Sequence, residues 1–137
     1  MCTVMDTPAI VVRSPSSGGT AVLSYDGEET LHVSIKSAAL CATKQVWLYT
    51  DGAELNSFFQ MLGEKTASWR DVLSWQSVEQ DFVISVTCSP LGQIDFKIIL
   101  HEQCNGDESW HMQLVIRNDF SALPGIAGQS AIVFAEA

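Results

Sequence analysis

The sequence predicts an α+β fold, in which an antiparallel sheet of about six to eight strands, ending in a meander, packs against one or two helices. Apolar and polar residues alternate along several short segments, as they do in half-buried strands. Short turn sequences separate these segments, which favours antiparallel pairing. One segment has clear helical spacing of its apolar residues, which predicts a helix that covers the sheet.

The size and composition indicate one domain that spans residues 1–137. The chain has 137 residues, of which 47% are hydrophobic and 17% charged. A chain of this length buries roughly two-thirds of its unfolded surface, so it needs no disulfide or metal to fold. The cysteines, none of which forms a C-x-x-C pair, are expected to be free thiols: Cys2, Cys41, Cys88 and Cys104.

The first half of the chain is expected to form several strands and then a helix. The strands are predicted at residues 9–13, 20–25, 30–36 and 44–50. Trp47 is out of phase with its apolar neighbours Val46 and Leu48, so it is predicted to face the other side of the sheet. The helix is expected to begin at an Asp51 cap and to stop at Gly63. Its predicted inner face consists of Leu55, Phe58, Phe59 and Leu62.

The second half is expected to form the meander and a further helix. Strands are predicted near residues 82–88, 94–100 and 110–116, each with its apolar residues on one face. Trp110 is in phase with that face. A second helix is predicted after Asp119, with Pro124 in its first turn. Its predicted inner side consists of Leu123, Ile126, Ala127, Ser130 and Ala131.

The charge balance restricts the expected partners. Sixteen acidic and seven basic residues give a net charge of −9. Nucleic acid and anionic membranes are not expected to bind, because both require clustered Lys and Arg. An acidic surface suits a basic protein partner. The N-terminal segment lacks the basic and apolar regions of a signal peptide, so a cytoplasmic location is expected.

Motifs for catalysis and cofactor binding are not found. The sequence lacks a G-x-S-x-G nucleophile elbow and the glycine-rich loops that bind phosphate. His101 and Cys104 form one H-x-x-C pair with His111 beyond it, but zinc sites usually need two closely spaced pairs. The sequence therefore predicts a non-enzymatic protein without a metal or cofactor.

Three acidic groups are the candidate binding surfaces. One turn contains the first group and another turn the second, whereas the third surrounds a tryptophan that could anchor an interface. The candidate residues are Asp26, Glu28 and Glu29 in the first group, Asp107 and Glu108 in the second, and Asp71, Trp75, Glu79 and Asp81 in the third.

The segment from Leu55 to Leu100 carries a family resemblance. It contains a helix, the Trp69-Arg70 pair, a W-x-S-[LV]-E-x-D-[LF] run over residues 75–82, and an alternating strand after Gly92. This layout resembles that of small bacterial proteins of unknown function. It is also similar to immunity proteins of polymorphic toxin and contact-dependent growth inhibition systems.

The resemblance implies an immunity protein that binds the C-terminal toxin domain of its cognate toxin and blocks it. Many such toxins are nucleases with basic clefts, which an acidic inhibitor could fill. Two other functions remain open from the sequence. One is a small ligand-binding or enzymatic domain with a pocket between sheet and helix, and the other is a scaffold protein with a different protein partner.

Overall fold

The computed structural model describes residues 8–49, 52–103 and 109–135. These residues form eight strands in two antiparallel four-stranded sheets, together with two α-helices. The first sheet has the order β1-β2-β3-β4, and its strands are β1 (Ile10–Arg13), β2 (Thr20–Tyr25), β3 (Thr30–Lys36) and β4 (Cys41–Trp47). The second sheet has the order β5-β6-β7-β8, and its strands are β5 (Leu73–Gln76), β6 (Phe82–Cys88), β7 (Gln93–Gln103) and β8 (Ser109–Asp119).

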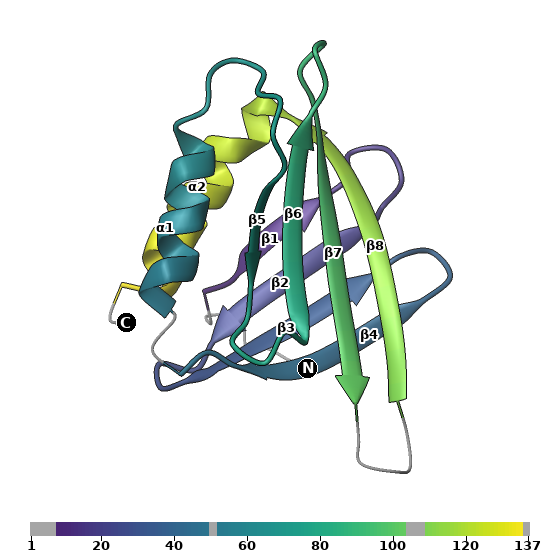
Figure 1. The fold of residues 1–137 in the computed structure, drawn as a ribbon, viewed down its shortest axis with the longest axis vertical. Helices are drawn as coiled ribbons and strands as arrows, with labels where there is room; N and C mark the ends of the chain where they lie inside the picture. Colours follow the sequence, from purple (N-terminus) through teal and green to yellow (C-terminus); the bar gives the residue numbers. More distant parts are fainter. Residues whose placement is uncertain (1–7, 50–51, 104–108, 136–137) are drawn as a thin grey trace.

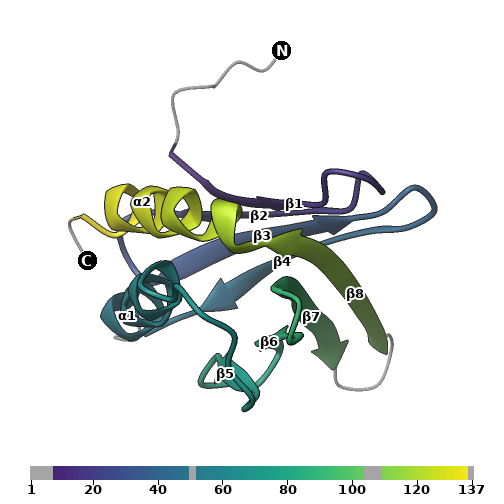
Figure 2. The same ribbon diagram turned by 90° about the horizontal axis from the view of Figure 1, so that it is seen from above.

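The predicted α+β class with an antiparallel meander is confirmed, but the strands divide between two layers. Figure 2 shows β1–β4 above and β5–β7 below, with β8 sloping down from the level of the first sheet and both helices to one side. The apolar faces of the sheets form one core, to which Leu31 and Val33 contribute from β3 and Phe96 and Ile98 from β7. The meander is therefore covered by the other sheet, because one helix is too narrow to cover a four-stranded face.

Helix α1 (Gly52–Gly63) has the predicted inner face, since Leu55, Phe58, Phe59 and Leu62 are all buried. The Asp51 cap lies outside the described residues. Helix α1 packs beside helix α2 (Leu123–Val133) (Figure 1). Gly63 permits this contact, because a Cβ atom there would lie 2.6 Å from the Cβ atom of Ala127.

The start of the second helix is as predicted. The Asp119 carboxylate accepts a hydrogen bond from Ser121 N at 2.9 Å and caps a 3-10 turn, Phe120–Ala122, from which α2 continues. Pro124 lies in the first turn of α2, where its missing N–H costs no helical hydrogen bond. The predicted inner side is correct except for Ala131, which is exposed.

The segment between residues 41 and 76 differs most from the expectation. Strand β4 begins at Cys41 and ends at Trp47, whereas residues 44–50 were predicted. Trp47 does face away from the core, as expected. No strand was predicted in the segment with Trp69 and Trp75, but this segment contains β5, which pairs with β6.

No helix within the described ranges has the length and apolar character needed to cross a bilayer.

Candidate functional site

The end of the molecule next to the β2–β3 turn brings together aromatic and acidic side chains from both sheets. We call this surface the aromatic–acidic patch, and it consists of Glu29, Trp47, Tyr49 and Glu79. Glu28 and Glu29 lie in the β2–β3 turn. The chain after β4 is held against this turn, because Leu48 N donates a hydrogen bond to Glu29 O at 2.7 Å. The patch is thus assembled from segments far apart in the sequence.

The two aromatic side chains of the patch are solvent-exposed. Trp47 is 44% exposed and Tyr49 is 42% exposed, while Leu48 between them is completely buried. Trp47 points outward because side chains alternate along β4, and Tyr49 lies in a left-handed turn after the end of this strand. The two rings lie against each other, with their centroids 6.4 Å apart. Exposed aromatic pairs of this kind can bury a large area with little loss of conformational entropy.

A hydrogen bond fixes Tyr49 against the second sheet. Its hydroxyl donates to Glu79 Oε2 at 2.6 Å. This hydrogen bond raises the pKa of Tyr49, followed by desolvation and by the charges of Glu79, Glu29 and Asp81. The phenol therefore stays protonated, and carboxylates from two sheets surround it.

The backbone is strained at one residue of the patch and at one residue next to it. Tyr49 and Gln80 have φ angles of 54° and 61°, which lie in the left-handed region that non-glycine residues rarely adopt. Both residues adjoin the bond between Tyr49 and Glu79. Strained residues of this kind persist only where surrounding contacts hold them, and they gather at functional sites.

A partly buried ion-pair network lies near the patch. Lys44 on β4 places its Nζ atom 3.4 Å from Asp81 Oδ2 and 2.7 Å from Glu102 Oε1 on β7, so it joins the two sheets. Burial alone would lower the pKa of Lys44, but the hydrogen bond to Glu102 and the charge of Asp81 outweigh burial and raise it. Asp81 also accepts a hydrogen bond from Ser77 Oγ at 2.7 Å.

The structure separates the predicted binding residues. Glu79 adjoins the turn that contains Glu28 and Glu29 through Tyr49. Asp26 shapes that turn, because its carboxylate accepts hydrogen bonds from Glu28 N at 2.8 Å and Thr30 N at 3.2 Å. These two bonds place the Asp26 carboxylate within the turn.

Three other predicted residues do not join the patch. Trp75 is only 7% exposed and packs edge-on against Phe82, so it belongs to the core and offers a partner little surface. Asp81 is 8% exposed and paired with Lys44, so it presents little free charge to a partner. Asp71 lies before β5, at the opposite end of the β5–β6 hairpin from Glu79. Asp107 and Glu108 lie outside the described residues.

Sequence reasoning missed Tyr49 and Lys44. The signal for both was the alternation around Val46 and Leu48. Tyr49 is out of phase with these buried residues, as Trp47 is, so it points outward. Lys44 is in phase with them, so its charge points inward and must find a partner.

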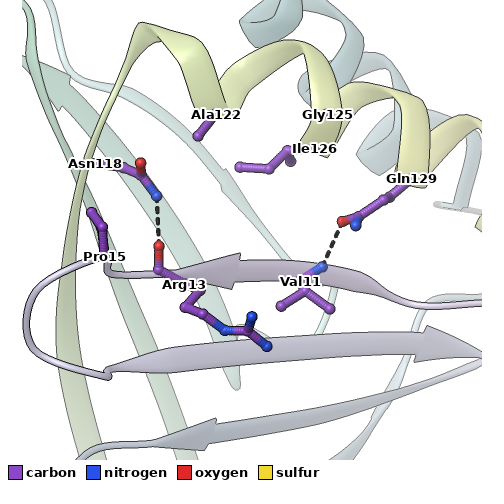
Figure 3. Close-up of a pocket in the computed structure, with 8 residues that line it drawn as sticks. All are labelled: Val11, Arg13, Pro15, Asn118, Ala122, Gly125, Ile126 and Gln129. Atoms are coloured by element: carbon purple, nitrogen blue, oxygen red, sulfur yellow. Dashed lines mark hydrogen bonds between the residues drawn. The ribbon is translucent and has the colours of Figure 1, made fainter.

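A groove of about 500 Å³ lies between α2 and the edges of β1 and β8 (Figure 3). Side chains cap the backbone of β1 there. Gln129 Oε1 accepts a hydrogen bond from Val11 N at 2.8 Å, and Asn118 Nδ2 donates to Arg13 O at 2.7 Å. Its floor includes Ile126, and Gly125 leaves open space above it.

The stacked pair of His101 and His111 lies across β7 and β8, with ring centroids 6.1 Å apart. The Nε2 atom of His101 is 2.7 Å from Gln80 O, so this ring is held by the turn that also carries Glu79. Among the described residues, no three His, Cys, Asp or Glu side chains are grouped so that they could hold a metal ion.

A family model matches residues 22–134, which include every element that forms the patch. The chain belongs to the "Family of unknown function (DUF6228)". The match to DUF6228 extends from β2 to the C-terminal cap of α2, so every element except β1 and the first two residues of β2 lies within the family region. No curated protein and no solved structure is detectably similar to this DUF6228 chain.

Proposed function

We propose that this protein is a non-enzymatic immunity protein that binds the basic C-terminal domain of a cognate toxin and blocks it. The aromatic–acidic patch is the observation that carries the proposal. In it, two exposed aromatic rings lie among carboxylates from both sheets. This combination is typical of a surface that binds Lys- and Arg-rich proteins, because the rings attract cations and the carboxylates pair with them.

The patch is preorganised for such a partner. The contact of Tyr49 with Trp47 and its hydrogen bond to Glu79 hold the rings in place before binding. Binding therefore costs little additional side-chain entropy. A specific complex would bury about 1,200–2,000 Å², with the two aromatic residues near its centre.

The overall charge supports the same proposal. A net charge of −9 accelerates association with a basic domain through long-range attraction, and salt weakens that attraction. The proposed place of action is the cytoplasm, where the immunity protein would meet an incoming toxin domain. The non-enzymatic character is part of the proposal and follows from a function that needs binding alone.

Co-expression with the toxin domain encoded next to this protein tests the proposal. Cells that produce both proteins are expected to survive, whereas cells that produce the toxin domain alone die. Equal death with and without this protein would refute the proposed function.

Variants then test the patch in the purified complex. Trp47→Ala is expected to raise the dissociation constant by about 30-fold, as hot-spot aromatics do. Glu79→Lys is expected to slow association and to reduce its salt dependence. Asp71→Lys is the matched control, because it makes the same charge change at the other end of the same hairpin. If Asp71→Lys and Glu79→Lys change the association rate and its salt dependence equally, the patch is not the binding surface.

The groove beside α2 supports a second candidate function, a small-molecule binding domain. Its volume of about 500 Å³ lies in the range of ligand sites, and it is located between sheet and helix. Gly125→Leu is the test, because a side chain at Gly125 meets open space and would fill the groove. A metabolite that raises Tm of the natural protein but not of Gly125→Leu would support this function.

A further inference from the structure

A second groove separates the two outer strands β4 and β8. It has a volume of about 520 Å³ and is lined by Leu40, Cys41, Ala42 and Thr43 on one side, and Trp110, His111, Met112 and Gln113 on the other. Strand β4 is the last strand of one sheet, and β8 is the last strand of the other (Figure 1). The groove therefore lies where two sheet edges are left without a neighbouring strand.

The backbone of β4 turns its unpaired side to this opening. Ser37 N donates to Leu40 O, and Leu48 N donates to Glu29 O, so even-numbered residues of β4 pair with β3. The N–H and C=O groups of Cys41, Thr43 and Gln45 point the other way. Within the described parts of the chain, these groups have no hydrogen-bond partner.

Strand β8 presents the same pattern. His101 N donates to Asp81 O, so odd-numbered residues of β7 pair with β6 and even-numbered ones pair with β8. Consequently, the backbone groups of His111 and Gln113 on β8 point outward at the groove. Two unpaired edges thus flank one opening.

The groove is lined by apolar side chains from both strands, namely those of Leu40, Ala42, Trp110 and Met112, beside polar ones. Leu40 is 64% exposed, while Trp110 and Met112 form part of the floor. No acidic residue within the described ranges lines this groove. A charged ligand would lose hydration here without gaining an ion partner, so a neutral segment with apolar side chains complements the groove.

The two edges of the first sheet differ in a way that identifies the open one. At β1, the side chains of Gln129 and Asn118 occupy outward backbone groups. Natural proteins block free edges in this way to prevent unwanted strand pairing. The edge of β4 has no such block among the described residues, and its row of outward residues ends at Trp47 of the aromatic–acidic patch.

We propose that the β4 edge binds an extended, apolar and uncharged segment of the partner protein, which adds a strand to the first sheet and covers the floor of the groove. The inference rests on the proposed function in one respect, because a toxin domain bound at the aromatic–acidic patch would lie next to β4. Backbone hydrogen bonds from Cys41, Thr43 and Gln45 provide the affinity, and apolar side chains facing Ala42 and Met112 provide the selectivity.

Peptide display on the purified full-length protein tests the site without the toxin. Ten-residue peptides with an apolar residue at every second position are selected, synthesised and titrated. Saturating peptide is expected to slow alkylation of the exposed Cys41 thiol by at least tenfold, as quantified by mass spectrometry of the Cys41 fragment. Methylation of the peptide's backbone nitrogens at alternate residues is expected to weaken binding by at least tenfold, because ladder bonds are lost while side chains remain.

Protein variants locate the binding edge. Thr43→Pro removes one outward N–H group and is compatible with an edge strand, so it is expected to weaken binding about tenfold. Arg13→Pro makes the same change at the blocked β1 edge and is expected to leave binding unchanged. The proposal is overturned if no selected peptide protects Cys41, if methylated and natural peptides bind equally, or if the protein dimerises through β4. None of these outcomes affects the survival test of the proposed function.

Discussion

Lys44 allows the link between the two sheets to be tested by one substitution. Lys44→Met keeps the length and apolar stem of the side chain but removes the charge that Asp81 and Glu102 share. The side chains of Lys44 and Asp81 are only 13% and 12% exposed. The variant therefore leaves a poorly hydrated carboxylate without its cation, with Ser77 as its remaining side-chain partner.

The expected loss of stability follows from this burial. Removal of one member of a fully buried ion pair costs about 3–5 kcal/mol. The network here retains some solvent contact, because the Glu102 side chain is 31% exposed. We therefore expect the free energy of unfolding to fall by about 2–3 kcal/mol, which lowers Tm by about 8–12 °C in a chain of this size.

Urea and thermal unfolding, followed by circular dichroism, measure this loss. Arg117→Met is the matched control, since it breaks the pair with Asp95 that also joins two groups of opposite charge. The Arg117 side chain is 61% exposed. Exposed ion pairs contribute little to stability, so Arg117→Met is expected to lower the free energy of unfolding by less than about 1 kcal/mol.

The pH dependence of the Lys44 effect has a definite sign. Its pKa is raised in the folded protein. The stabilisation by Lys44 is therefore complete below the ordinary lysine pKa of about 10.4 and disappears as the pH rises through the higher folded value. The natural protein and Lys44→Met should therefore differ less in their free energy of unfolding when the pH is above the pKa of Lys44 in the folded protein. Equal losses for Lys44→Met and Arg117→Met at pH 7 would refute the role of Lys44 in joining the sheets.

Three further variants test local features by unfolding measurements. Gly63→Ala is expected to lower the free energy of unfolding by about 1–3 kcal/mol, because its new Cβ atom would lie 2.6 Å from the Cβ atom of Ala127. Adding Ala127→Gly to this variant should recover the lost stability. Equal stability of the single and double variants would contradict this explanation. Gln80→Gly should stabilise the protein by up to about 1 kcal/mol by relieving its positive φ angle of 61°, and a loss of stability would show that no strain exists there. The pKa of Asp26 is lowered, chiefly through the hydrogen bond that its carboxylate accepts from Glu28 N. The stabilisation by the Asp26 carboxylate is therefore present above pH about 4 and is lost as the pH falls through the pKa of Asp26 in the folded protein. Asp26→Asn should therefore reduce stability at pH 7 but not at pH 2, and an equal reduction at both would exclude this cause.

The elements with strong alternation were predictable from sequence. Strands β2, β3 and β6 have the predicted bounds, because one buried face imposes a period of two on each. The inner face of α1 was predictable for the same reason, with helical spacing. The predicted bounds of β4 were wrong and β5 was not predicted, because the β3–β4 turn and the short strand β5 show little alternation of apolar and polar residues.

The division into two sheets was not predictable, because alternation specifies which face of a strand is buried but not what covers it. The same apolar face of β7 would suit a helix or a second sheet. The patch was hidden for a related reason. Glu29 and Glu79 were both candidates, but only the pairing of β3 with β4 and the left-handed turn at Tyr49 bring them to one surface.

The alternation of β4 explains how one strand can join the two sheets and also contribute to both proposed binding surfaces. Its inward residues include Lys44, which joins this strand to the second sheet through ion pairs rather than through backbone hydrogen bonds. Because the link uses a side chain, the outward backbone groups of Thr43 and Gln45 have no hydrogen-bond partner among the described residues. Its outward side chains end in Trp47, which is exposed to solvent. A ladder of hydrogen bonds between β4 and β8 would close the sheets more firmly, but it would remove the groove and the open edge together.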